Sequence, residues 1–301
     1  MARVANGPAE EMSASWQAPT FLVVGVVAAS FSPILIRYAD GAEPLAISFW
    51  RCAAGAALLL PWAGRGLGSL SSRHKKLCAI SGAFLAVHFA TWITSLELTS
   101  VASSVLLVST TPVFIALVAP WIVGERLTKL GWLGIALAFG GTIAIAGLDF
   151  GGASLPGNAL ALAGGATVAG YMLAGRVARR DLPILSYAVA TYGVAALLLA
   201  VVCVAGGVPL WGYPGGTWLA IAGIVAGPQL LGHTVLNLVL SKIDATTVSV
   251  SLMAEPIIAT ALATWLFSEI PTLVFYPGGL AILAGIYIVS TNQRAAELPP
   301  T

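Results

Sequence analysis

From Thr111 to Ile145 the chain reads TPVFIALVAPWIVGERLTKLGWLGIALAFGGTIAI, and a related stretch, AEPIIATALATWLFSEIPTLVFYPGGLAILAGIYIV, runs from Ala254 to Val289. Both contain the pattern P-x8-W-x3-E-x2-T-x5-G-x6-G, in which one apolar run ends and the next begins. The pattern aligns Pro112, Trp121, Glu125, Thr128, Gly134 and Gly141 with Pro256, Trp265, Glu269, Thr272, Gly278 and Gly285. Agreement at these chemically distinctive positions predicts an internal repeat.

The composition of the whole chain is strongly apolar. Of its 301 residues, 58% belong to the set AVILMFWYC and only 9% are charged, and the mean hydropathy is +0.93. Soluble proteins carry about 25% charged residues, and a globule with so few could not cover its surface with charge. The composition therefore predicts an integral membrane protein.

Charge and cysteine content exclude several kinds of partner. The net charge is only +2, and the basic residues form no long tract, which argues against nucleic-acid binding. Cys52, Cys78 and Cys203 all lie in apolar stretches, so neither a disulfide framework nor a zinc site is expected. We expect no metal and no cofactor.

Ten apolar segments are long enough to cross a bilayer, whose core of about 30 Å needs about 20 helical residues. The eighth is the weakest candidate, because it contains Gly227-Pro228, Gln229, His233 and Asn237. Residues 1–16 form an N-terminal tail without the basic start of a signal peptide, and 292–301 form a C-terminal tail. The segments cover residues 17–37, 44–62, 77–96, 100–123, 129–148, 157–176, 183–205, 216–240, 245–267 and 272–291.

The placement of basic residues supports this count and predicts an orientation. Short cytoplasmic loops of membrane proteins collect Lys and Arg. With ten spans, Arg37 stands alone on one side and Arg51 lies inside a span. The other side holds Arg3, Arg65, Arg73, Lys75, Lys76, Arg126, Lys129, Arg176, Arg179, Arg180, Lys242 and Arg294. Both termini are therefore expected in the cytoplasm.

The repeat divides the chain into two halves of five spans, residues 17–148 and 157–291. Because five is odd, the second half must enter the membrane from the opposite side, which makes the repeat inverted. Inverted repeats are typical of secondary transporters, whose substrate site lies near the midplane where the halves meet. The expected fold is all-α, with ten transmembrane helices as two inverted five-helix repeats.

Nearly the whole chain resembles the EamA family of the drug/metabolite transporter superfamily, and the paired blocks that contain Pro112 and Pro256 are the most specific part of the resemblance. Within it, the chain is most similar to the YddG-type exporters of aromatic and other amino acids. The resemblance implies a bacterial inner-membrane exporter in which spans five and ten lie outside the helices that enclose the substrate. The second block departs from the first at SEIPT against GERLT, where it loses the basic residue.

An ionised side chain at the bilayer centre costs about 2.5–3.5 kcal/mol on insertion scales, so it is expected to face a cavity or a partner. Glu255 lies about ten residues into the ninth span, hence near the midplane. It is a candidate to bind a substrate amine or to take up a proton. Alternatively, it hydrogen-bonds the backbone freed by Pro256 or a neighbouring tyrosine.

The eighth span carries Gln229, His233 and Asn237 at four-residue steps, which would place them on one face of an α-helix. They are expected to line a cavity, or alternatively to join helices by hydrogen bonds. In the third span, His88 and Trp92 form a similar pair, whose indole suits an aromatic ring or an ammonium group.

Arg51 lies about seven residues into the second span, where it would extend to the interface, pair with a carboxylate or bind a substrate carboxylate. Tyr171, Tyr187 and Ser30 are further candidates for substrate contact.

Two further features of the repeat are expected to be structural. Glu125 and Glu269 are expected to meet the amino ends of the helices that follow them. The glycines of spans five and ten form smooth faces for packing within the protein or against a second copy, so a homodimer is permitted.

The chain has no P-loop and no H-E-x-x-H motif, and no G-x-S-x-G lies in a span. We expect no catalytic residues and predict a secondary transporter that exports amino acids, aromatic or large apolar ones, by alternating access. The alternatives are a transporter of another metabolite or drug, a membrane-embedded enzyme using His88, His233 and Glu255, or a channel. Proton coupling through Glu255 and facilitated diffusion both stay open.

Overall fold

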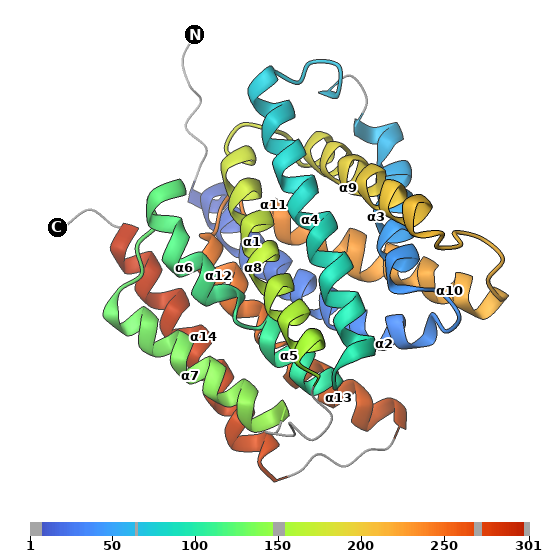
Figure 1. Ribbon diagram of the computed structural model, residues 1–301. Coiled ribbons are helices and arrows are strands. Elements are labelled where there is room, and N and C mark those ends of the chain that lie inside the picture. Colours follow the sequence, from blue (N-terminus) through green and yellow to red (C-terminus); the bar gives the residue numbers. More distant parts are fainter. Residues whose placement is uncertain (1–7, 64–65, 147–153, 268–272, 298–301) are drawn as a thin grey trace.

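The computed structural model describes residues 8–63, 66–146, 154–267 and 273–297, and all regular structure in these ranges is helical. Figure 1 shows one bundle in which the helices run in both directions. The helices are α1 (Pro8–Ser30), α2 (Ser32–Tyr38), α3 (Pro44–Ala63), α4 (Ser72–Leu98), α5 (Val101–Val108), α6 (Thr111–Ile122), α7 (Lys129–Ala146), α8 (Leu155–Ala178), α9 (Ile184–Gly206), α10 (Gly215–Ile224), the π-helix η2 (Val225–Thr234), α11 (Val235–Val239), α12 (Ala245–Leu252), α13 (Glu255–Phe267) and α14 (Phe275–Glu297).

The expected ten-helix architecture is confirmed. In the described part of the chain, eight helical segments are long and apolar enough to cross a membrane. The shorter apolar helix Lys129–Ile145 and the 23-residue α14 supply the fifth and tenth spans. The first, fourth and ninth spans each consist of two half-helices, α1 with α2, α5 with α6 and α12 with α13.

The breaks in these spans follow from proline. Pro33, Pro112 and Pro256 each occupy the second position of the second half-helix. Proline lacks a backbone N–H and its ring collides with the preceding turn, so the helix restarts there. The breaks before α6 and α13 fall at equivalent positions of the repeat, as its symmetry requires.

The eighth span differs from the uniform α-helix that the sequence predicts. Its centre is π-helical from Val225 to Thr234 and contains Pro228. A proline inside a helix removes one i→i−4 hydrogen bond, and a wider helical turn accommodates this loss.

The two halves are inverted with respect to each other, as expected. Helix α4 of the third span packs against α8 of the sixth span. The equivalent spans, the eighth with η2 and the first with α1, pack against each other in the same way. Helix α3 packs against its own counterpart, α9. Such reciprocal pairing is what a twofold axis between the halves produces, and it places the interior of the protein between them.

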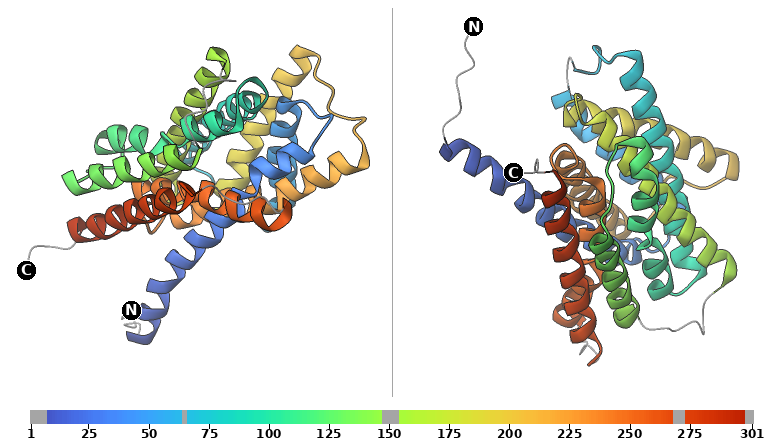
Figure 2. Two further views of the ribbon diagram at one scale, coloured as in Figure 1. Left: turned by 90° about the horizontal axis from the view of Figure 1, so that it is seen from below. Right: turned by 90° about the vertical axis from the view of Figure 1, so that its left-hand side faces the viewer.

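Helices α7 and α14 form a separate pair beside the bundle, which Figures 1 and 2 both show. Gly134 faces the backbone of Gly285, and Gly141 faces that of Gly278. These contacts make the two helices antiparallel and bring them into backbone contact. The glycine faces are thus used within the chain.

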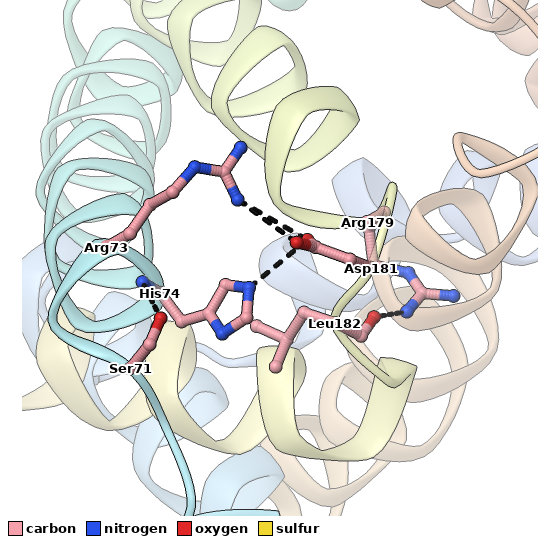
Figure 3. Close-up of polar contacts among 6 residues, drawn as sticks. All are labelled: Ser71, Arg73, His74, Arg179, Asp181 and Leu182. Atoms are coloured by element: carbon pink, nitrogen blue, oxygen red, sulfur yellow. Dashed lines mark hydrogen bonds and ion pairs between the residues drawn. The ribbon is translucent and has the colours of Figure 1, made fainter.

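One end of the bundle gathers the basic connections: the start of α4 and the links α6–α7, α8–α9 and α11–α12. We call it the basic end. Figure 3 shows Arg73 and His74 of α4 directed at Asp181 in the α8–α9 link, with nitrogen–oxygen distances of 3.2 and 3.1 Å. Arg179 donates to the carbonyl of Leu182 in the same link. The hydrogen bond from His74 and the charge of Arg73 hold the pKa of Asp181 below its ordinary value.

Some residues used to predict orientation cannot be placed at this end. Arg3, Arg65, the side chain of Arg294 and the outermost parts of both tails lie outside the described residues.

Replacing Gly141 by alanine is expected to destabilise the protein by about 1–3 kcal/mol, the usual range for overpacking, because the new methyl group would collide with the backbone of Gly278. The neighbouring Gly140 has nothing within 4 Å of the same position, so Gly140→Ala is the matched control and is expected to be neutral or slightly stabilising. Thermal unfolding in detergent measures both. Equal melting temperatures for the two variants would contradict the packing of α7 on α14.

Candidate functional site

A cavity of about 90 Å³ lies between the two halves. None of its lining residues comes from α7 or α14, which agrees with the expectation that spans five and ten lie outside the enclosing helices. The lining residues are Ala29, Ser32, Arg51, His88, Trp92, Val108, Ser109, Thr111, Pro112, Val168, Pro228, His233, Leu236, Ser249, Leu252, Met253 and Glu255.

Arg51 supplies a positive charge to this cavity. Its side chain is fully buried on α3, Nε donates to Oε1 of Gln229 at 2.9 Å, and the guanidinium carbon lies 3.7 Å from the ring centroid of Phe89. Nη1 reaches Ser32 Oγ at 3.5 Å. Among the described residues Arg51 has no carboxylate partner, and Nη2 has no hydrogen-bond partner. A buried cation without a counter-ion is expensive, so the cavity is suited to an anionic group.

His88 and Trp92 form one wall. Their rings are stacked, with centroids 5.7 Å apart and planes 4° apart. Nδ1 of His88 lies 2.9 Å from the carbonyl oxygen of Gly164, and because a carbonyl only accepts, Nδ1 carries the hydrogen. The indole nitrogen of Trp92 is buried without a partner in the described part of the chain, which leaves a second donor for a ligand.

His233, on the π-helix, lines the cavity beside this wall. Its ring centroid lies 6.4 Å from that of His88, 5.1 Å from Phe89 and 5.8 Å from Tyr171. The two histidines come from equivalent spans of the two halves. The inverted packing therefore brings residues that are distant in sequence to one aromatic surface.

Glu255 supplies a carboxyl group. It is the first residue of α13 and lines the cavity in a half-buried position. A carboxylate is stabilised at the amino end of a helix. The structure therefore places a guanidinium and a carboxyl group in one small cavity.

Three predicted residues lie near the cavity without being part of its lining: Gln229, Asn237 and Tyr171. Gln229 is buried and holds Arg51. Asn237 is buried on α11 and donates to the hydroxyl of Tyr171 and to the carbonyl of His233. These side chains position the residues that line the cavity.

Among the described residues, no three His, Cys, Asp or Glu side chains gather as metal ligands would.

Two predicted residues lie elsewhere. The Tyr187 hydroxyl lies 2.6 Å from Ser81 Oγ, and its ring packs in a separate cluster with Cys78 and Leu182. Ser30 donates to the carbonyl of Val26 in its own helix at 2.8 Å. Neither lines the cavity.

Sequence reasoning missed several polar lining residues, among them Ser32, Thr111 and Ser249. Thr111 is the repeat counterpart of Glu255, so the repeat could have predicted that Thr111 also lines the cavity. Ser32 and Ser249 carry no comparable signal, because isolated hydroxyls in apolar helices usually bond to their own backbone.

The expected partner of Glu125 needs correction. Thr128, not Glu125, accepts a hydrogen bond from the first turn of α7, at Gly131 N. Glu125 instead accepts from Ala245 N at the start of α12 and from Arg176. Burial raises the pKa of Glu125, and the hydrogen bond from Arg176 opposes this effect. Its repeat counterpart, Glu269, lies outside the described residues.

Comparison with known proteins identifies the class of this protein. The chain matches the EamA-like transporter family twice, over residues 17–147 and 155–291, and belongs to that family. It is a multi-pass membrane protein of a transporter family within the drug/metabolite transporter superfamily.

A solved structure described only as "Crystal structure of protein" shares the fold, with a TM-score of 0.78 at 20% sequence identity. The match covers 93% of this chain and 99% of the other. No curated protein matches the chain.

Replacing Gln229 by leucine is expected to lower the free energy of unfolding by about 1.5–3 kcal/mol, the usual worth of a hydrogen bond to a charged group, because Arg51 would lose its acceptor. Gln229→Glu keeps an acceptor for Nε and serves as the control. Denaturation in detergent followed by circular dichroism compares the two. A leucine variant as stable as the wild type would show that this contact does not support Arg51.

Proposed function

We propose that this transporter exports amino acids, with aromatic or large apolar side chains, by alternating access across the bacterial inner membrane. One observation carries the proposal: a single cavity between the halves contains the buried guanidinium of Arg51, which has no carboxylate partner among the described residues, together with the carboxyl group of Glu255. An α-amino acid is a zwitterion, so its carboxylate would bind Arg51 and its ammonium group would bind Glu255.

The free donors of the cavity support a carboxylate ligand. A buried donor left without an acceptor costs about 1–3 kcal/mol. Arg51 Nη2 and Trp92 Nε1 are both in this condition among the described residues. A substrate carboxylate would satisfy Arg51 through a charge-assisted hydrogen bond, the strongest kind available in a protein.

The remaining surface of the cavity suits an apolar side chain. Val108, Val168, Leu236, Leu252 and Met253 line it beside the aromatic wall. Stacked or edge-to-face contacts with aromatic rings contribute about 0.5–1.5 kcal/mol beyond the area buried. Aromatic and large aliphatic side chains would gain most from these contacts.

The test is transport of radiolabelled amino acids into proteoliposomes, together with their methyl esters and decarboxylated amines. We expect the wild type to prefer the intact zwitterion at least about tenfold, the ratio for 1.4 kcal/mol, and Arg51→Gln to lose this preference because the carboxylate has no partner. Glu255→Gln and His88→Ala are expected to reduce uptake as well. Ser30→Ala, buried but outside the cavity, is the matched control.

Wild-type rates in folded Arg51→Gln and Glu255→Gln would remove both residues from the substrate site. Preference for nucleotide sugars in the same assay would favour another metabolite, and recovery of a product with changed mass would favour an enzyme. Flux that fails to saturate would favour a channel. A dependence of the rate on an imposed pH gradient would distinguish proton coupling from facilitated diffusion.

We further propose that the basic end faces the cytoplasm, with both termini there, because cytoplasmic loops are rich in Lys and Arg. Lys75 is exposed at this end, and Gly216 is exposed at the start of α10 with open space around it. In intact cells, an impermeant maleimide is expected to label Gly216→Cys and not Lys75→Cys. The native cysteines are all buried, so the background is low. The reverse pattern would invert the proposed orientation.

A further inference from the structure

A half-buried ion pair joins the two halves at the basic end. Arg176 Nε lies 2.6 Å from Glu125 Oε1, and the two side chains are only 17% and 11% exposed. The neighbouring pair of Arg73 and Asp181 is 54% exposed on both sides. Surface pairs contribute little, whereas removing one partner of a buried pair leaves an uncompensated charge. The pair of Glu125 and Arg176 is much less exposed than the pair of Arg73 and Asp181, and it is therefore the stronger constraint at this end.

The pair connects four segments through its hydrogen bonds. Glu125 comes from the α6–α7 link of the first half and also accepts from Ala245 N, at the start of α12, at 3.0 Å. Arg176, near the end of α8, also donates to the carbonyl of Leu240, just after α11, at 2.6 Å. Glu125 of the first half thus contacts two segments of the second half directly and a third through Arg176.

The opposite end is hollow. A depression of about 360 Å³ lies there, lined by residues of α2, α3, α4 and α5 and their links. The depression and the cavity are lined by successive residues of the same two helices: Ser32 and Trp92 line the cavity, and Pro33 and Ile93 line the depression.

Arg37, which lines the depression, corresponds to Arg176 when Pro44 is aligned with Pro183. Arg37 is exposed and makes no ion pair with any other described residue. Equivalent arginines of the two halves therefore differ: Arg176 is half-buried in an ion pair, whereas Arg37 is exposed and has no ion-pair partner in the described part of the chain. In an inverted repeat this difference marks one closed end and one open end.

We propose that Glu125 and Arg176 form the gate that closes the cavity at the basic end, and that the present conformation is open toward the opposite end. This inference rests on the proposed alternating access but not on the identity of the substrate. Opening toward the basic end requires the Glu125–Arg176 pair to separate. Loss of the pair therefore shifts the population toward the conformation open at the basic end.

The experiment measures access to the cavity instead of transport. Ser249 lines the cavity, so Ser249→Cys reports access when an impermeant thiol reagent is added to membrane vesicles of either orientation. The side of the basic end is the side from which Lys75→Cys is labelled. From that side, we expect Glu125→Gln and Arg176→Gln to raise the labelling rate of Ser249→Cys at least about tenfold, within the usual range of conformational coupling. Arg73→Gln and Asp181→Asn remove the exposed pair at the same end and are expected to leave the rate unchanged.

Arg176→Lys keeps the charge and loses the planar fork, so an intermediate rate is expected and the test does not depend on one variant. Size-exclusion profiles identify the folded variants. An unchanged rate in all folded Glu125 and Arg176 variants would overturn the gate, and so would an equal rise in Asp181→Asn. A protein that transports no amino acid but shows the expected labelling would overturn the substrate proposal and leave the gate in place.

Discussion

Hydrocarbon offers no hydrogen bonds, so every polar group of a membrane span must find its partner inside the protein or in a cavity. This constraint explains where the helices break. The backbone freed before α6 and α13 lies at the level of the cavity, and residues beside both breaks line it. Interrupted helices exposed to lipid would leave backbone groups unsatisfied. The position of the cavity and the positions of the prolines are therefore two consequences of one requirement.

The same requirement makes Arg51 informative. Its guanidinium has no counter-ion among the described residues and is tolerated because Gln229 and the ring of Phe89 partly compensate its charge. The compensation is incomplete, since Nη2 stays unpaired among the described residues. A ligand that supplies the missing hydrogen-bond acceptor would stabilise this site more than a ligand without one. The cost of the unsatisfied donor in the empty protein would therefore favour ligands that carry an acceptor.

Symmetry relates the static fold to the transport cycle. Two halves of one design, inserted in opposite directions, can adopt each other's conformation without new contacts having to evolve. The tight pair of α7 and α14 stays outside the cavity-forming helices, where it is suited to support the bundle while they move. In the proposed transport cycle, the difference between the ion-paired Arg176 and the exposed Arg37 would be a property of one state and would reverse in the other.

Local patterns along the chain were sufficient to predict the helices, their number, the inverted repeat and five residues of the cavity lining: Arg51, His88, Trp92, His233 and Glu255. Hydropathy and the cost of a polar group in lipid depend on the residue itself, so they can be estimated from the sequence without knowing which residues pack against it. The orientation of a buried hydroxyl cannot be read in this way. Tyr187 and Ser30 were therefore expected at the cavity but found their partners elsewhere.

Contacts between the halves became visible only in three dimensions. Glu125 was expected to meet the next helix along the chain, yet it binds Arg176 and the start of α12, which lies 120 positions away. The π-helical turn around Pro228 and the partner of Arg51 were equally hidden. Hydropathy places each segment in the membrane, whereas the partner of a charged group depends on which helices pack side by side, and that depends on the shapes of all of them together.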